Sequence, residues 1–146
     1  MLKEVTALHA KRAKTARLLK FSVVGCSGVL VNTAALYFLS RKLHLPLAAS
    51  SAVAVEIAVI SNYVLNEFWT FAGGAASVTR LAKFNIASLA GLGVNVLAVW
   101  SLTRLDMYYL IANLFGVGIA FGLNYILSTA WVWSRALWYE ISPAPS

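Results

Sequence analysis

Apolar residues gather along the chain into four long runs, which short polar segments separate. The runs cover residues 21–39, 45–66, 81–102 and 108–131. A helix needs about 20 apolar residues to cross a bilayer, and it satisfies its own backbone hydrogen bonds in lipid. The pattern therefore predicts an all-α membrane protein with four transmembrane helices.

The second half of the chain repeats the first half at an offset of 62 or 63 residues. The clearest pairs are Lys20 with Lys83, Phe21 with Phe84, Asn32 with Asn95, Asn62 with Asn124, and Trp69 with Trp131. Each copy holds two spans, so both copies enter the membrane from the same side. We therefore predict two tandem parallel helical-hairpin repeats, related by an axis along the membrane normal.

The predicted organisation follows from these two copies. Residues 21–71 form the first repeat and residues 81–133 the second, with a basic amphipathic segment at 1–20 and a short tail at 134–146. The segment 1–20 is rich in Lys, Arg, Leu and Ala, and we expect a helix that rests on the lipid head groups. It either sets the membrane topology or docks a partner.

The composition excludes a soluble or nucleic-acid-binding chain. Hydrophobic residues make up 60% and charged residues 12%, and the mean hydropathy is +0.76, whereas soluble domains are about 45–50% apolar. Of the 12 lysines and arginines, nine fall in the terminal segments and the central loop and three in the hairpin loops. Because positively charged segments stay in the cytoplasm, both termini are predicted to be cytoplasmic, in a multi-pass protein of the inner (cytoplasmic) cell membrane.

Little of the sequence suits catalysis or a metal ion. Cys26 is the single cysteine, so no disulfide forms within the chain. His9 and His44 stand alone, and the sequence holds no nucleophile–base set and no metal-ligand spacing. The sequence therefore predicts no enzymatic activity, no cofactor and no metal site.

Polar side chains recur at the cytoplasmic end of each predicted hairpin. Lysine supplies positive charge, and Asn and Ser supply hydrogen bonds, to a phosphate group, while an indole stacks on a sugar or anchors a helix. Each also has a structural interpretation, because lysines snorkel and tryptophans favour the membrane interface. The candidate head-group site consists of Lys20, Asn62, Asn66 and Trp69 in the first repeat and Lys83, Asn124, Ser128 and Trp131 in the second.

A second set of polar groups lies at mid-membrane depth in the predicted spans. Asn32 and Asn95 follow stripes of small residues, a pattern that suits helix packing or a polar path. Glu56 lies near the centre of its span, where a carboxylate costs roughly 2.5–3.5 kcal/mol. We expect Glu56 to face the bundle interior, to pair or to be protonated. Together with Tyr63 and Tyr125, these residues form a candidate translocation path.

These residues resemble the GtrA-like family of polytopic membrane proteins over about residues 18–135. The family often has Arg or Lys directly after the second Asn of its motif, where this chain has Glu67, and Ser128-Thr129 stands at the corresponding place in the second copy. The resemblance rests on Lys20-Phe21…Val24-Gly25…Asn32, Asn62-Tyr63-x-x-Asn66-x-x-Trp69-Thr70-Phe71, Lys83-Phe84…Asn95 and Asn124-Tyr125…Trp131-Val132-Trp133.

The resemblance implies a role in cell-surface polysaccharide synthesis. Family members are thought to move polyprenyl-phosphate-linked sugars between leaflets or to assist glycosyltransferases. We therefore predict translocation of a polyprenyl-phosphate-linked sugar or related lipid phosphate by a homo-oligomer that contacts membrane lipids and no nucleic acid. Two alternatives stay open. One is a membrane anchor or accessory subunit that recruits a polyprenyl-phosphate glycosyltransferase, and the other is a small multidrug-type antiporter.

Overall fold

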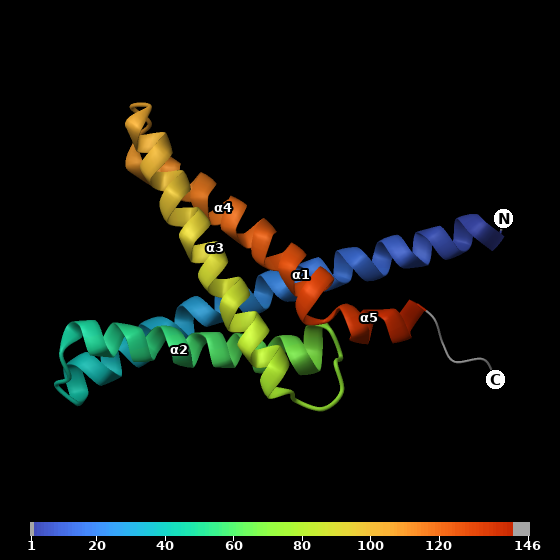
Figure 1. Cartoon of the computed structure of the whole chain (residues 1–146), viewed down its shortest axis with the longest axis horizontal. Coiled ribbons are helices and arrows are strands. Elements are labelled where there is room, and N and C mark those ends of the chain that lie inside the picture. Colours follow the sequence, from blue (N-terminus) through green and yellow to red (C-terminus); the bar gives the residue numbers. More distant parts are fainter. Residues whose placement is uncertain (1, 142–146) are drawn as a thin grey trace. The chain divides into compact units, whose positions relative to one another are not determined.

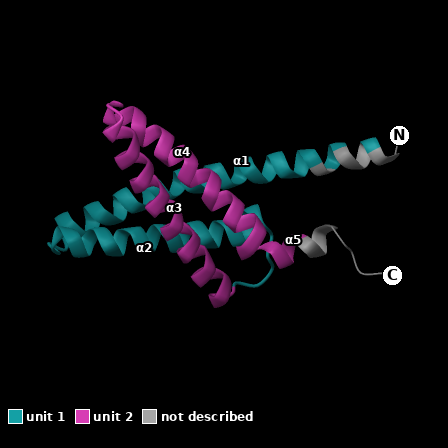
Figure 2. Cartoon of the chain, turned by 45° about the horizontal axis from the view of Figure 1, so that its top comes forward, with its two compact units in different colours: residues 1–76 teal, residues 77–146 magenta. Residues whose placement is uncertain are grey.

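The computed structural model describes residues 2–141, which are helical apart from short turns and contain no strand (Figure 1). Four of the helices are long and apolar enough to cross a membrane. The prediction of an all-α membrane protein with four spans is therefore confirmed, and the chain is a multi-pass membrane protein. It divides into two compact units, Met1–Ala76 and Ser77–Ser146 (Figure 2). The orientation in the membrane and the repeat relation stay predictions.

Unit 1 is a helical hairpin. Helix α1 (Leu2–Tyr37) continues into the π-helical segment η1 (Phe38–Lys42), and after a turn α2 (Leu47–Leu65) continues into the π-helical segment η2 (Asn66–Thr70). Pro46 precedes α2 with φ −53°, which suits the start of a helix because its missing N–H needs no partner there. The turn between the two helices is therefore short and places them side by side.

Helix α1 is longer than a membrane span. Its 36 residues correspond to about 54 Å at 1.5 Å per residue, against a hydrocarbon core of about 30 Å. The helix passes through Lys20 and Phe21 without a break. The predicted boundary between the N-terminal segment and the first repeat is therefore not a helix boundary. The basic residues belong to the same continuous helix as the first span.

Unit 2 is a second hairpin with an added short helix. The Ser77 side chain accepts a hydrogen bond from the backbone N–H of Arg80 and so caps the start of α3 (Val78–Arg104). After a turn, α4 (Tyr109–Leu127) continues into the π-helical segment η3 (Ser128–Val132), and α5 (Ser134–Ile141) follows. The predicted tail at 134–146 thus begins as a helix, and its residues 142–146 lie outside the described part of the chain.

The second long helix of each unit ends in the same wide turn. The N–H of Phe71 donates to the carbonyl of Asn66 over 2.9 Å, and the N–H of Trp133 donates to the carbonyl of Ser128 over 2.9 Å. Each bond joins residues five apart, which is the π-helical spacing and often marks a functional site. The wide turn rotates the closing aromatic residue toward the first helix of its own hairpin.

Small residues let the two helices of each hairpin approach closely. On α4, Ala112 and Gly116 are buried against α3, and a Cβ added at Gly116 would lie 3.1 Å from the carbonyl oxygen of Asn95 and 3.2 Å from Val99. Lipid tails are as apolar as leucine, so close packing rather than the hydrophobic effect holds such helices together. The large apolar side chains instead point outward, where lipid covers them.

The packing predicts a sharp contrast between two glycines on α4. Gly116→Ala should lower the free energy of unfolding in detergent by about 1–3 kcal/mol, because the added methyl group has no space beside Asn95. Gly118→Ala is the matched control, since no atom lies within 4 Å of its added Cβ. Thermal and denaturant unfolding measure both variants, and equal effects would contradict the assigned helix–helix contact.

Candidate functional site

In unit 1, the candidate lysine lies against the candidate tryptophan. The Nζ atom of Lys20 lies 5.6 Å from the centroid of the Trp69 indole and donates a hydrogen bond of 3.2 Å to the Trp69 carbonyl. Within about 6 Å the negative face of an indole attracts a cation. The ammonium group also compensates a carbonyl that the end of η2 leaves without a helical partner. Lys20, within α1, and Trp69, on η2, therefore form one lysine–indole pair where the second helix of the hairpin ends.

Unit 2 contains the same pair at the corresponding positions. The Nζ atom of Lys83 lies 5.6 Å from the centroid of the Trp131 indole. Lys83 is half-buried on the first turns of α3, and Trp131 is exposed on η3. Each indole therefore presents an amphipathic surface beside a fixed positive charge, which suits the boundary between head groups and hydrocarbon.

An aromatic contact holds each lysine–indole pair in place. In unit 1 the rings of Phe21 and Phe71 meet edge to face with centroids 6.1 Å apart. In unit 2 the rings of Phe84 and Trp133 meet in the same way at 5.5 Å. Phe21 and Phe84 directly follow the two lysines in sequence, and the other ring of each pair follows a π-helical segment. The contact thus ties the end of the second helix to the middle of α1 in unit 1 and to the first turns of α3 in unit 2.

Amide and hydroxyl groups of the candidate site are buried around these pairs. Asn66 is 1% exposed and Ser128 is 0% exposed, at corresponding positions of η2 and η3. Buried oxygens without a hydrogen-bond partner are costly and call for an explanation such as a ligand or a water molecule. Among residues 2–141, which the structure describes, such oxygens belong to Asn32, Asn62, Asn66, Thr70, Asn95, Asn124 and Ser128.

Residues of the candidate path are only partly brought together. A cavity of about 230 Å³ between α3 and α4 is lined by both Asn95 and Asn124. The sequence pattern predicts Asn95 in the translocation path and Asn124 in the head-group site. In unit 1, Asn62 lies against Gly28 on α1, and Tyr63 is buried. Glu56 is exposed on α2, away from the packed face that Ala54 and Ala58 form.

Glu67 lies where the resembling family often has a cation, and it is 0% exposed on η2. It makes at least one polar interaction. Tyr125, the counterpart of Tyr63, is half-buried on α4. Among the described residues, the structure gathers no group of three or more His, Cys, Asp or Glu side chains that suits a metal ion.

Sequence reasoning missed a group of polar residues in unit 2. A cavity of about 370 Å³ opens beside the Lys83–Trp131 pair, and its lining adds Thr79, Arg80 and Arg135. The sequence pattern places Arg80 and Arg135 among the cations of the predicted cytoplasmic side and not among the residues of the candidate head-group site. The available signal was the position of Arg135, two residues after the closing aromatic residue of the hairpin.

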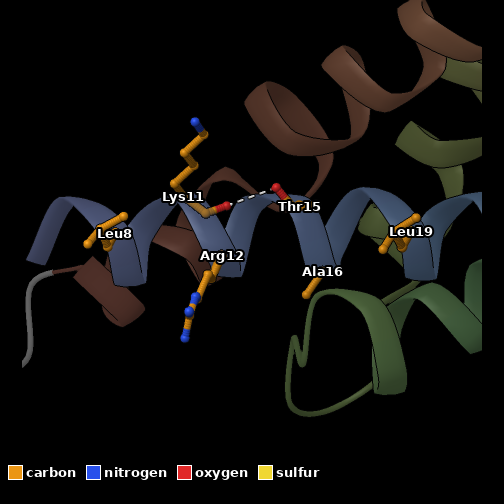
Figure 3. A pocket seen from close by; sticks show the side chains of 6 residues that line it. All are labelled: Leu8, Lys11, Arg12, Thr15, Ala16 and Leu19. Atoms are coloured by element: carbon orange, nitrogen blue, oxygen red, sulfur yellow. Dashed lines mark hydrogen bonds between the residues drawn. The ribbon is translucent and has the colours of Figure 1, made fainter. Parts of the chain in front are cut away.

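A further hollow runs along the N-terminal part of α1 (Figure 3). Its volume is about 400 Å³, and its lining, all from α1, combines Lys11 and Arg12 with apolar residues such as Leu8 and Leu19. The hydroxyl of Thr15 is engaged with the carbonyl of Lys11 at 3.1 Å. This face suits the surface of an anionic bilayer, and whether it sets the topology or docks a partner stays a prediction.

Two comparisons place the chain among known proteins. Residues 20–133 match the family model described as GtrA/DPMS, transmembrane domain. Over 135 residues the chain is 36% identical to a protein of Pyrococcus furiosus named dolichol-phosphate mannosyltransferase. The match covers 91% of this chain and 38% of that relative. The predicted resemblance is therefore confirmed.

One prediction is wrong. The sequence predicted no enzymatic activity, whereas the relative is named as a mannosyltransferase, which is an enzyme. The prediction rested on the lack of a catalytic set of side chains within this chain. That criterion covers only the side chains of this chain, which matches 38% of the relative.

The aromatic contact of unit 2 predicts a measurable coupling. In a double-mutant cycle in detergent, Phe84→Ala and Trp133→Ala should each destabilise the chain, with a coupling energy of about 0.5–1.5 kcal/mol beyond the loss of buried area. A cycle of Phe84→Ala with Trp100→Ala serves as the control, because Trp100 is exposed on α3. Additive effects in the first cycle would contradict the assigned ring contact.

Proposed function

Since the chain belongs to the GtrA/DPMS transmembrane-domain family, we propose that it is the membrane domain of a polyprenyl-phosphate glycosylation system. It binds a polyprenyl phosphate, free or sugar-linked, for a glycosyltransferase that makes or uses the sugar lipid. The transferase unit is another domain or another chain. The observation that carries this proposal is the lysine–indole pair, which recurs with the same 5.6 Å separation in both units.

The chemistry of a polyprenyl phosphate matches the arrangement of groups in each unit. The phosphate takes positive charge from a lysine and hydrogen bonds from amides and hydroxyls. The indole of Trp69 or Trp131 provides a flat surface for a sugar ring. The prenyl tail needs only an apolar surface, which the outward faces of the long helices supply, with Leu30 73% and Leu114 71% exposed.

Membrane topology brings both pairs to the same leaflet under this proposal. Four consecutive spans return the chain to the starting side after each hairpin, so the two pairs share one side. The excess of Lys and Arg in the termini and central loop supports a cytoplasmic location for that side. The protein then works in the cytoplasmic membrane of the cell, with the phosphate held at the inner head-group level.

Binding of a long-chain lipid phosphate tests the proposal. The chain in nanodiscs should bind dolichyl phosphate more tightly than the neutral alcohol dolichol, and the Lys20→Gln/Lys83→Gln double variant should bind dolichyl phosphate at least about tenfold more weakly, because each charge-assisted bond contributes roughly 1.5–3 kcal/mol. Native mass spectrometry and competition with a labelled lipid measure the affinities.

The double variant Arg41→Gln/Arg104→Gln is the matched control. It also removes two positive charges, from the opposite ends of the two hairpins, and should leave the affinity within twofold of the native value. Equal affinity for dolichol and dolichyl phosphate would sink the proposal, as would equal losses in the two double variants.

Translocation of the sugar-linked lipid is a second candidate function. The supporting observation is the cavity between α3 and α4, in which Asn95 and Asn124 line one surface at different depths of the span. Their unpartnered side-chain oxygens offer hydrogen bonds to the hydroxyls of a passing sugar. The tail stays in lipid during this movement, so the protein needs to shield only the head group.

A leaflet-exchange assay tests translocation. In liposomes, a labelled polyprenyl-phosphate sugar should exchange faster with the protein than without it, and Asn95→Leu should slow exchange at least about tenfold, because the cavity loses a polar group at mid-membrane depth. Asn113→Leu is the control, since Asn113 is exposed near the start of α4. Equal exchange with and without protein would exclude translocation and leave the binding role intact.

A further inference from the structure

We infer that the cavity beside the Lys83–Trp131 pair in unit 2 is the principal phosphate site of this chain, and that the corresponding region of unit 1 is not. The inference rests on the proposed function and assigns its phosphate group to one of the two units. The ligand class is a phosphate ester or anhydride, from a lipid head group or from a soluble phosphate compound.

Positive charge concentrates in this cavity. Arg80, Lys83 and Arg135 line it, and its lining residues include no carboxylate. Lys83 is fixed over the Trp131 ring, so part of the entropy of ordering its long side chain is already lost before a ligand arrives. Guanidinium groups bind phosphate through paired hydrogen bonds, and the ammonium adds a point charge. With a volume of about 370 Å³, the cavity falls within the size range of small-molecule sites.

Hydroxyl groups and the start of α3 complete the cavity. Ser77, Thr79 and Ser134 line it together with the cations. The Ser134 hydroxyl donates a long bond of 3.5 Å to the Trp131 carbonyl, and a hydroxyl can turn to donate to a phosphate oxygen instead. Ser77 and Thr79 stand at the start of the 27-residue helix α3, whose dipole favours an anion. Three independent features, namely side-chain charge, hydroxyl donors and the helix start, therefore favour the same ligand.

Unit 1 keeps part of this set at the matching positions, because the offset of 63 residues pairs Arg80 with Arg17 and Ser77 with Lys14. It differs at three further positions. The offset of 63 residues pairs Thr79 with Ala16, and the offset of 62 pairs Ser134 with Ala72 and Arg135 with Gly73. Two hydroxyls and one guanidinium group are thus replaced by Ala or Gly, which have no side-chain donor or charge for a phosphate. The two units thus share a lysine–indole pair and an arginine three residues before the lysine, and unit 2 adds the hydroxyls of Thr79 and Ser134 and the guanidinium of Arg135.

An acidic side chain also distinguishes unit 1 from unit 2. Glu67, next to Asn66, carries an acid where unit 2 has Thr129 next to Ser128. The ammonium of Lys20 is engaged with the Trp69 carbonyl at 3.2 Å, so a phosphate there would compete with a bond that the fold uses. The lysine–indole pair of unit 1 therefore stabilises the hairpin end, and that of unit 2 serves the ligand.

Single substitutions in the full chain test this assignment with citronellyl phosphate, a short isoprenyl phosphate. Lys83→Gln and Arg135→Gln should each weaken binding at least about tenfold, and Lys20→Gln should change it less than twofold. Arg104→Gln is the matched control, because Arg104 also lies over an indole of unit 2, at 5.0 Å from Trp100, and lies at the far end of α3. Quenching of tryptophan fluorescence and calorimetry measure binding in nanodiscs.

The source of the phosphate is separated by two further probes. If inorganic pyrophosphate binds as tightly as citronellyl phosphate, the cavity takes a soluble phosphate compound, and if it binds at least tenfold more weakly, the ligand is the lipid. The affinity for citronellol, which lacks the phosphate, should be the same in the native chain and in all four variants.

The failures of the inference and of the proposed function are distinguishable. If Lys20→Gln weakens binding as much as Lys83→Gln, or if Arg135→Gln has no effect, the assignment to unit 2 is overturned while lipid-phosphate binding stands. If the native chain binds citronellyl phosphate no better than citronellol, the proposed function fails as well. Circular dichroism and thermal unfolding of each variant confirm that a loss of binding reflects the site and not the fold.

Discussion

Close approach of two helices within each hairpin is the constraint on which the rest of the structure depends. In a bilayer, apolar side chains gain little by leaving lipid, so helices associate where small residues let backbones meet. Ala54 and Ala58 provide this surface in unit 1, and Ala112 and Gly116 provide it in unit 2. Because these faces are narrow, the bulky side chains point outward, and the polar groups at the hairpin ends are placed by the helix pair rather than by a broad core.

The packing of each helix pair positions a lysine–indole pair at the end of its second helix. A five-residue π-helical segment closes each second helix and turns an aromatic ring onto the residue that follows the lysine, as Trp133 does with Phe84. That ring contact holds the lysine beside its indole. Unit 2 then surrounds the pair with Arg80 and Arg135. The same arrangement thus occurs in both hairpins, and under our proposal the residues around it decide which hairpin binds a phosphate.

Much of this arrangement was predictable from the chain, and the parts that were not have physical reasons. The four spans and the Lys83–Trp131 pair follow from apolar runs and from matched positions in two copies. The continuity of α1 through residue 20 did not follow from the sequence. Basic and apolar residues have similar helix propensities and differ only in their preferred surroundings, so a change in composition does not show whether a helix ends there. The exposure of Glu56 was also not predictable from the sequence. A helical pattern shows which residues share a face, but not which face meets the partner helix.

The sequence by itself determined the class of protein, the number of spans and the polar residues available for chemistry, because these depend on local composition and on the cost of polar groups in lipid. The tertiary structure alone decided which of those residues act together. Arg80 and Arg135 stand 55 residues apart and meet in one cavity only because α3 and η3 pack side by side. Proximity of that kind arises from the close packing of helices, and no residue pattern along a single helix contains it.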